Sequence, residues 1–585
     1  MKIKGTTISQ GIAIGQAHLL DVEKFLLPSY EIKDEEVESE VNRFNAALKL
    51  TIEEIEEIKE KTRQSASDEA GAIFDVHIAI LNDPTLKRNT VTRIIKERKN
   101  AEQAFTTSIK NVVEVLEKSS DPYFKERAID IRDLARRVIV NLQGKKKSDS
   151  PTYESPIVVS SQLSPSQTSV LHASVKGFVT EHGGKTSHTA IIARSLEIPA
   201  VIGVKGIVEA VSPGDEIIID GIDGLVIIKP TEDEKEEYLN KLKAFKERRS
   251  KLLEESKKPS KTVDGHHIKI RCNIDFEEEL EKVNEFGVEG VGLYRSEFLY
   301  LKCAPELPSE EDHFETYKRI AEAAYPFKAV IRTLDLGGEK YFHEQLAPQE
   351  VNPVLGLRAI RFSLRHHQFF KTQLKGILRA STKKNLEIMF PMVTIVEELK
   401  TAKDVLKEAM QDLKREGVPF DEEIKVGIMI EIPICALNAE AFALDVDFFS
   451  IGTNDLIQYL MAIDRNNESV AGYYDPHHPA FLRLLLSIAS VAKRNKIGLS
   501  ICGEVASDPD MIPLLIGLGY DEFSMTPQSV LEVKSKIISL LYKECRKIAL
   551  EATKMKTGRQ VRNLLKGSKM PSFLGIKLGK TKDES

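Results

Sequence analysis

The sequence contains few cysteines and no cysteine motif. Five cysteines occur among the 585 residues, at positions 272, 303, 435, 502 and 545, and no two of them form a CxxC pair. Disulfide frameworks and structural zinc sites are both recognised by closely and regularly spaced cysteines. The pattern therefore fits neither of them, and the reducing cytoplasm is the compartment that we expect.

The sequence also lacks long apolar runs. The first twenty residues, MKIKGTTISQGIAIGQAHLL, contain no apolar core of the length found in signal peptides. No later segment approaches the roughly 20 consecutive apolar residues that a membrane-spanning helix needs. We therefore expect neither secretion nor contact with a membrane.

An excess of one charge is missing as well. The net charge of −6 is small for 585 residues and gives no reason to expect a nucleic acid as partner. With 42% hydrophobic and 29% charged residues, the composition is that of an ordinary globular protein. A chain of this length exceeds what a single hydrophobic core can hold, so three or four domains are expected.

The N-terminal part combines short β-runs with a long helical region. Residues 1–20 are predicted to contain short strands, and apolar residues spaced by three and four within 21–144 predict a small helical bundle. After a polar linker, short apolar runs and Gly-rich turns predict a compact α/β domain over 145–230. A charged helix at 232–257 indicates that residues 231–260 are a linker.

From residue 262 onward, predicted strands and helices alternate. Eight runs are predicted as strands, at 267–275, 290–297, 329–336, 386–393, 425–432, 448–455, 498–505 and 521–527. Eight strands separated by helices are typical of a (β/α)8 barrel. The sequence therefore predicts a multidomain α/β protein with a barrel over 261–567 and a tail, 568–585, without a core of its own.

Polar residues gather where the predicted barrel strands end. They are Arg295 and Glu297 after strand two, Arg332 and Asp335 on strand three, Glu431 after strand five, Asn454 and Asp455 after strand six, and Cys502 and Glu504 at strand seven. Active sites of such barrels lie at the C-terminal ends of the strands. The clustering therefore predicts a site at this end of the barrel.

The residue types in this cluster indicate the kind of substrate. Arg295 and Arg332, with Arg465 further along the chain, carry planar guanidinium groups suited to phosphate and carboxylate. Glu431 and Asp455 offer oxygen ligands, and proteins usually hold Mg²⁺ with one or two carboxylates and substrate oxygens. A small phosphorylated acid bound together with a metal ion is therefore indicated.

A second candidate site lies in the predicted α/β domain. In the segment GGKTSHTAIIARSLEIPAVIG, Gly183 and Gly184 permit an unusual turn, and Thr186 and Ser187 can cap a helix that begins near His188. A helix start favours phosphate through its free N–H groups and its dipole. His188 is therefore predicted to be a nucleophile that accepts a phosphoryl group.

These motifs resemble those of enzyme I of the bacterial phosphoenolpyruvate-dependent sugar phosphotransferase system. The similarity extends over about residues 5–550 and includes SQGIAIG, AIFDVHIAILNDP, GGKTSHTAIIARSLEIPAVIG, GLYRSEFLY, IRTLDLGGEK, GIMIEIP, FFSIGTNDLIQY and ICGE, in the order of the family. It implies a swivelling phosphohistidine α/β domain made of 1–20 and 145–230. The inserted helical bundle, 21–144, would bind the carrier protein HPr, and the barrel would bind phosphoenolpyruvate.

The resemblance also implies a role for each site residue. His188 would carry the phosphoryl group, and Cys502 would donate the proton that converts the enolate into pyruvate. The residues that would bind phosphoenolpyruvate are Arg295, Arg332, Asn454 and Arg465, and Glu431 and Asp455 would bind Mg²⁺. Asp68 and Glu69 fall in the family's docking region for HPr. A homodimer formed through the barrel is implied as well.

Two other functions share part of this chemistry. A pyruvate phosphate dikinase or phosphoenolpyruvate synthase would need a nucleotide-binding domain of a few hundred residues, and the 21–143 region is predicted to be a helical bundle instead. A regulatory phosphorelay that feeds no transporter would use the same chemistry. The sequence departs from the family at Ser160, Ser161 and Gln162, where an acidic pair is common, and this affects the surroundings of His188 rather than the reaction.

Overall fold

The computed structural model describes most of the chain. The described residues are 1–19, 30–65, 78, 80–117, 131, 134, 135, 137–143, 156–161, 175–182, 193, 198–303, 307–336, 352–465, 467 and 469–568. They fall into two compact units, and the division lies between Lys246 and Glu247. Both residues belong to helix α9 (Glu232–Ser256), which is the charged helix predicted at 232–257.

The first unit contains a mixed sheet of eight described strands. Their order across the sheet is β1-β8-β7-β3-β4-β5-β6-β2. The bounds are β1 Lys2–Lys4, β2 Thr6–Ser9, β3 Ile12–Leu19, β4 Ile157–Ser160, β5 Gly177–Thr180, β6 Ala200–Ile202, β7 Glu216–Asp220 and β8 Leu225–Ile228. Strand β3 pairs in parallel with β4 and antiparallel with β7, so the chain before and after the helical region contributes to one sheet.

The helical region of this unit contains α1 (Val37–Ser65), α3 (Pro84–Glu97) and α4 (Ala101–Glu117). Apolar residues of these helices share a core with Leu134, Val138 and Leu142. Helix α3 belongs to the bundle predicted over 21–144, but the segment Asn82-Asp83-Pro84 at its start can mark either the end or the beginning of a helix. The Asp83 side chain accepts a hydrogen bond from the Thr85 N–H and Pro84 follows it, which makes the same residues a helix start.

The second unit contains the predicted barrel. Its strands close in the order β9 to β16, and every neighbouring pair is parallel. The bounds are β9 Lys269–Ile274, β10 Gly290–Arg295, β11 Lys328–Arg332, β12 Leu386–Phe390, β13 Lys425–Ile430, β14 Phe448–Gly452, β15 Gly498–Cys502 and β16 Glu522–Met525. All eight predicted strands are confirmed.

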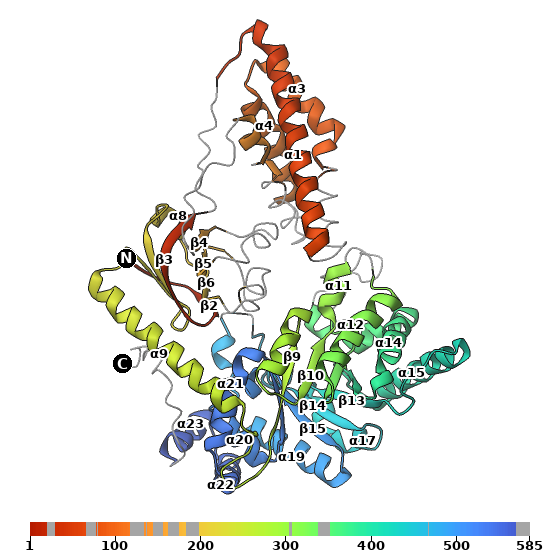
Figure 1. The fold of residues 1–585 in the computed structure, drawn as a ribbon. Coiled ribbons are helices and arrows are strands. Elements are labelled where there is room, and N and C mark those ends of the chain that lie inside the picture. Colours follow the sequence, from red (N-terminus) through yellow and green to blue (C-terminus); the bar gives the residue numbers. More distant parts are fainter. Residues whose placement is uncertain are drawn as a thin grey trace. The chain divides into compact units, whose positions relative to one another are not determined.

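Helices surround these strands (Figure 1). The larger ones are α12 Glu310–Ala324, α14 His367–Ala380, α15 Val396–Glu416, α19 Pro479–Asn495, α21 Pro527–Ser539 and α22 Tyr542–Ala552. The shorter ones are α10 Leu280–Glu285, α11 Glu297–Cys303, α13 Ala359–Arg365, α16 Pro433–Leu437, α17 Ala439–Ala443, α18 Thr453–Met461, α20 Ile512–Leu518 and α23 Gly558–Gly567.

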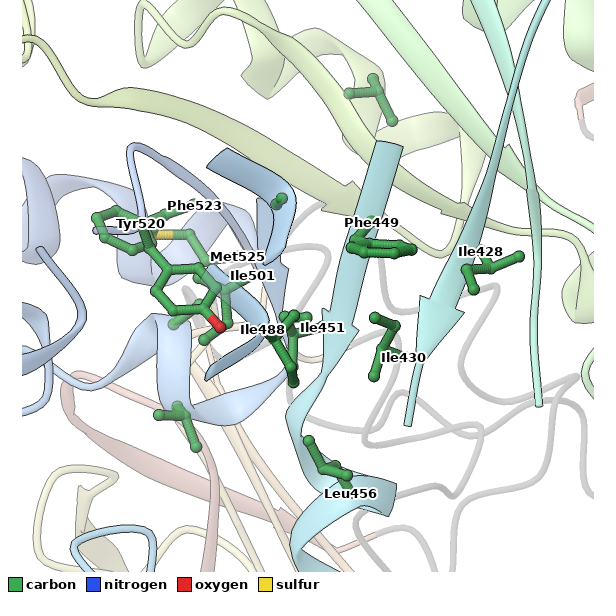
Figure 2. Packing of buried hydrophobic residues seen from close by; sticks show 14 of the residues in the cluster. Ile428, Ile430, Phe449, Ile451, Leu456, Ile488, Ile501, Tyr520, Phe523 and Met525 are labelled. Carbon is green, nitrogen blue, oxygen red and sulfur yellow. The ribbon is translucent and has the colours of Figure 1, made fainter. Parts of the chain in front are cut away.

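The alternation of side chains along each strand separates two cores. Ile428 and Ile430 of β13 and Phe449 and Ile451 of β14 point outward and pack with helix residues in the main core (Figure 2). The residues between them point into the barrel, where Leu293, Val330, Met389, Met429, Phe448 and Cys502 form a separate apolar cluster. Cys502 is therefore an inward-facing residue.

Charged groups lie below this inner apolar cluster, near the strand starts. The Arg271 guanidinium is 3.1 Å from a carboxylate oxygen of Glu522 and 4.0 Å from one of Glu387, and Lys328 also pairs with Glu387. Arg271 and Glu387 are only 7% exposed. Side chains thus fill the barrel interior at the N-terminal ends of the strands, which is its lower end here. The site therefore has to lie at the opposite end, where the strands have their C-terminal ends.

No helix in the described part of the chain is both long enough and apolar enough to cross a membrane. The five-part division at residues 20, 144, 230, 260 and 567 stays a prediction. The tail, apart from Ser568, lies outside the described residues.

The close packing of α20 against α22 gives a test of the fold. A Cβ atom at Gly517 would overlap the Cys545 carbonyl oxygen and lie 2.5 Å from the Ala549 Cβ, so Gly517→Ala should force the two helices apart. Overpacking of this kind costs roughly 1–3 kcal/mol. Urea unfolding followed by circular dichroism should show the loss. Gly567→Ala, where no atom lies within 4 Å of the added Cβ, is the control. Equal stability of the two variants would contradict the packing.

Candidate active site

Arg295 is the first site residue at the end of a strand. It ends β10, and its Nη1 donates to both carboxylate oxygens of Asp275, at 2.7 and 3.0 Å. Asp275 follows β9, the neighbouring strand. Because the side chain remains 28% exposed, the guanidinium is oriented by Asp275 and still accessible to an anion.

Arg332 is held more tightly. It ends β11 and is 8% exposed. Its Nη2 lies 3.0 Å from Glu297 Oε1, and its Nη1 lies 2.9 Å from Asp335 Oδ2. Glu297 Oε1 also accepts the Asp335 N–H at 2.8 Å, so these three residues form a closed arrangement.

Three carboxylates come together beside this arginine. Asp335, Glu431 and Asp455 each place an oxygen within 4.8 Å of the other two. Arg358 lies against them, 2.9 Å from Asp335 and 3.6 Å from Asp455. Oxygen atoms gathered in this way are the ligands that a hard divalent cation prefers.

The electrostatics of the group favour a bound cation. Burial, with repulsion from Asp335 and Asp455, raises the pKa of Glu431 well above its usual value. Burial and repulsion from Asp335 also raise the pKa of Asp455, against the opposing influence of Arg358 and Arg465. A divalent cation would relieve this repulsion. The carboxylates of this chain therefore fit a metal ion.

Glu431 has little freedom to move. Its Oε1 accepts the Met392 N–H at 2.6 Å. On its other side, a Cβ at position 452 would lie 2.7 Å from Glu431 Oε2, so only the glycine found there leaves room for the carboxylate. The ends of β12 and β14 thus hold the carboxylate from two sides.

Cys502 lies at the end of β15 with its thiol inside the barrel. The side chain is 2% exposed, its Sγ donates to the Ile451 carbonyl at 3.3 Å, and it accepts a hydrogen bond from Ser450 Oγ at 3.5 Å. Burial raises the pKa of the thiol. The group therefore stays protonated near neutral pH and can act as an acid.

Asn454 and Arg465 complete the predicted set. The Asn454 side-chain oxygen accepts the Glu504 N–H at 3.0 Å, and Arg465 lies 3.3 Å from the Glu504 carboxylate. Gly503, with φ +95°, allows this approach, because a Cβ there would lie 3.0 Å from the Asn454 side-chain oxygen. Arg465 is exposed, and it borders the site from the segment after α18.

Two important groups were missed by sequence reasoning. Asp335 was predicted at a strand end without a metal role, and Arg358 was not among the predicted site residues. The fold brings Asp335 within 4.8 Å of Glu431 and Asp455, and it brings Arg358 within 3.6 Å of Asp455. Asp335 could have been suspected from its place beside Arg332, whereas nothing in the sequence around Arg358 indicates which carboxylates it meets.

The second candidate site cannot be placed in the same way. His188, Gly183, Gly184, Thr186 and Ser187 lie outside the described residues. Asp68 and Glu69 also lie outside them. The nucleophile and the HPr contacts therefore stay predictions.

The chemistry available at the described site follows from its groups. Guanidinium groups can bind the phosphate and the carboxylate of a small anion, and the carboxylates can hold a divalent cation beside it. A buried thiol faces the same space. The arrangement suits a reaction in which negative charge develops on a substrate and one carbon or oxygen atom is then protonated.

Three family models match the chain. The model described as PEP-utilising enzyme, PEP-binding domain, matches residues 249–542. The N-terminal and the mobile domain of PEP-utilising enzymes match residues 4–127 and 153–224. Along the chain the N-terminal domain comes first, the mobile domain second and the PEP-binding domain third.

Curated relatives agree with these models over nearly the whole length. The phosphoenolpyruvate-protein phosphotransferase of Priestia megaterium is 42% identical over 541 residues, which cover 92% of this chain and 94% of the relative. The protein of the same name from Staphylococcus carnosus (strain TM300) is 41% identical over 566 residues, which cover 96% and 98%. A solution structure of Enzyme I (nEIt) is 41% identical, covers 42% of this chain and 99% of its own, and has a TM-score of 0.35.

Replacement of one carboxylate should weaken metal binding. Glu431→Gln keeps an acceptor for the Met392 N–H but removes a negative ligand, so the affinity for Mg²⁺ measured by calorimetry should fall by at least about tenfold. Because the pKa values of Glu431 and Asp455 are raised, protons compete with the cation, and affinity should decrease as the pH is lowered. Exposed Glu397→Gln should bind like the wild type, and equal binding by Glu431→Gln would exclude the cluster as a metal site.

Proposed function

Because the chain belongs to the PEP-utilising enzymes, and among them to the phosphoenolpyruvate-protein phosphotransferases, we propose that it transfers the phosphoryl group of phosphoenolpyruvate to its own His188 and then to the carrier protein HPr. Pyruvate is the other product. The reaction is the first step of sugar uptake by the phosphotransferase system. The observation that carries this proposal is the convergence of arginines, carboxylates and one thiol at the C-terminal end of the barrel.

Binding of phosphoenolpyruvate is assigned to Arg295, Arg332, Asn454 and Arg465. Guanidinium groups bind phosphate and carboxylate with paired N–H donors, which fixes the orientation of a planar substrate. In support, Arg295 and Arg332 are adjacent in the β10–β11 register, and Asn454 and Arg465 meet at Glu504. Two ends of the substrate can thus be held from two sides of the barrel.

Mg²⁺ is assigned to Glu431 and Asp455, with Asp335 as a further carboxylate of the group. When bound, the ion supplies positive charge beside the phosphate and the developing enolate. The protein residues keep their own tasks: Arg358 compensates Asp335 and Asp455, and the Met392 N–H orients Glu431.

His188 performs the phosphoryl transfer. Its Nε2 attacks the phosphorus in line with the bridging oxygen, the P–O bond to the enol breaks, and the enolate of pyruvate remains. The arginines stabilise the negative charge as it moves from the phosphoryl group to the enolate. The imidazole loses one proton when it becomes phosphorylated, and C3 of the enolate gains one, so the overall step consumes no proton.

Cys502 supplies the proton to C3. The inward thiol is kept protonated by burial and is oriented by Ser450 and the Ile451 carbonyl. Its thiolate regains a proton from water after pyruvate has left. Protonation of the enolate prevents the phosphoryl group from returning to the oxygen, which drives the transfer forward.

The same His188 has to serve two sites. We propose that the domain formed by 1–20 and 145–230 moves between the barrel and HPr docked on the helical region, 21–144. The helix α9 and its flanking turns are the hinge region in this proposal. The protein is further proposed to be a cytoplasmic homodimer, on the basis of its family.

The first test concerns His188. His188→Ala should not be labelled by ³²P-phosphoenolpyruvate, because the phosphoryl acceptor is missing. Label on the wild type should be acid-labile and base-stable, as expected for phosphohistidine. His267→Ala, which changes an exposed histidine before β9, should be labelled normally. Normal labelling of His188→Ala would reject the assignment, provided that circular dichroism shows both variants folded.

The second test separates phosphoryl transfer from protonation. In Cys502→Ala the enolate has to take its proton from water, so the rate of pyruvate formation should fall steeply. Calorimetry should still detect phosphoenolpyruvate binding, since the arginines are unchanged. Cys272→Ala is the matched control, because Cys272 is equally buried in the barrel wall but packs in the outer core.

Wild-type turnover by Cys502→Ala would make the thiol a packing residue. Glu504, which lies at the same end of β15, would then be the next candidate for the acid. Cys303, Cys435 and Cys545 have no position inside the barrel, so alanine at these sites should leave pyruvate formation nearly unchanged.

A further inference from the structure

Gln373 lies behind the arginine-bearing strand ends. It is located on α14, has no exposed surface, and uses its whole amide group. Its Oε1 accepts the Leu334 N–H at 3.1 Å. Its Nε2 donates to Ser296 Oγ and to the Tyr317 hydroxyl, each at 3.1 Å.

The partners of this amide are the neighbours of site residues. Ser296 lies between Arg295 and Glu297, and Leu334 precedes Asp335. The backbone pairing of β10 with β11 ends at Arg295 and Arg332. Beyond that point, the Gln373 amide connects the two chain segments that leave the strands. The Gln373 side chain thus links the segment that contains Arg295 and Glu297 to the segment that contains Arg332 and Asp335.

The amide can adopt only one orientation. Turned over, its NH₂ group would face the Leu334 N–H, and two donors would oppose each other. In the observed orientation the Tyr317 oxygen accepts from Gln373, so the Tyr317 O–H is free to donate to His313 Nδ1, 3.0 Å away. His313 Nε2 then carries the proton toward the Tyr300 hydroxyl at 3.4 Å.

This network is rigid and uncharged. Burial lowers the pKa of His313 to about 3, so the imidazole is neutral at any working pH. Helices α12 and α14 approach so closely at Gly376 that a Cβ there would overlap the His313 Cβ. Gly376 is one turn from Gln373 on the same face of α14. The close approach therefore fixes Gln373 relative to Tyr317 and His313.

We propose that Gln373 is a positioning residue for the reaction with phosphoenolpyruvate, which acts by holding the Ser296 and Leu334 segments, and with them Arg295 and Arg332, at the separation that the bound anion requires. The inference rests on the proposed function. Gln373 itself touches neither the substrate nor the reacting atoms. Its effect should therefore be seen in substrate binding and in the first half-reaction alone.

Gln373→Met tests the role at nearly constant volume. The Leu334 N–H and the Ser296 hydroxyl lose their partner, and the two segments are no longer tied. The KM for phosphoenolpyruvate should rise, and kcat/KM for phosphorylation of the protein should fall by about 10- to 100-fold. Transfer from phosphorylated protein to HPr should keep its wild-type rate, since the barrel takes no part in it.

Tyr520→Phe controls for a general loss of stability. The Tyr520 hydroxyl donates to the Leu485 carbonyl at 3.0 Å. Tyr520 is fully buried, precedes β16 and packs in the main core outside the barrel interior (Figure 2). Its removal costs a buried hydrogen bond in the same domain. The melting temperature should fall in both variants, whereas KM should rise only in Gln373→Met.

Gln373→Glu provides a pH-dependent rescue. At low pH the buried carboxyl is protonated and keeps one acceptor and one donor, so part of the link is restored. As the pH rises through the pKa of that carboxyl, the donor is lost and a negative charge faces the Glu297 segment. Activity relative to the wild type should therefore fall with rising pH, and the same ratio for Gln373→Met should stay flat.

The outcomes separate this inference from the proposed function. If phosphoenolpyruvate labels the wild type, either of two results would overturn the positioning role. One is a wild-type KM in Gln373→Met, and the other is a pH-independent ratio of Gln373→Glu activity to wild-type activity. Absence of labelling in the wild type would instead reject the proposed function. In that case calorimetry with phosphoenolpyruvate and Mg²⁺ still decides the inference, because Gln373→Met should bind the anion more weakly than Tyr520→Phe.

Discussion

Repulsion among three carboxylates is the constraint on which the described site depends. Asp335, Glu431 and Asp455 would separate in a flexible chain, yet their oxygens lie within 4.8 Å of one another. They stay together because each is attached at or just beyond a different strand end of one closed barrel, and because Arg332 and Arg358 compensate part of their charge. The barrel thereby holds the carboxylates in an arrangement that favours the binding of a cation. The nearby arginines favour the binding of an anionic substrate.

The arginines in turn depend on groups outside the site. Asp275 orients Arg295, Glu297 orients Arg332, and the Gln373 amide ties the segments that contain them. The Arg295 and Asp275 side chains remain 28% and 27% exposed, whereas Glu297, Arg332 and Gln373 are buried. The site is thus organised in two layers, in which neutral buried hydrogen bonds fix the backbone and partly accessible charges face the substrate.

The sequence predicted the barrel well because each strand is a short apolar run followed by polar residues. That pattern is local, and so are the strand-end positions of Arg295, Arg332, Glu431 and Cys502. The bounds of helix α3 within the predicted bundle could not be derived, because its buried stripe is only Leu86, Thr90 and Ile94 and because Asp83 and Pro84 can mark either end of a helix. The pairing of Arg358 with Asp455, and the link from Gln373 to Ser296, join residues that are far apart in sequence, so no local pattern could reveal them.

The filled lower part of the barrel has a kinetic consequence. In the described part of the chain, the ion pairs of Arg271 and the inner apolar cluster fill the barrel below the Cys502 thiol, as side chains fill barrels of this kind, so a substrate reaches the thiol from the C-terminal end. Entry and exit then share one opening. A product molecule blocks the next substrate until it has left, and a group that covers the opening during the reaction also detains whatever lies beneath it. Release of the product therefore has to precede binding of the next substrate.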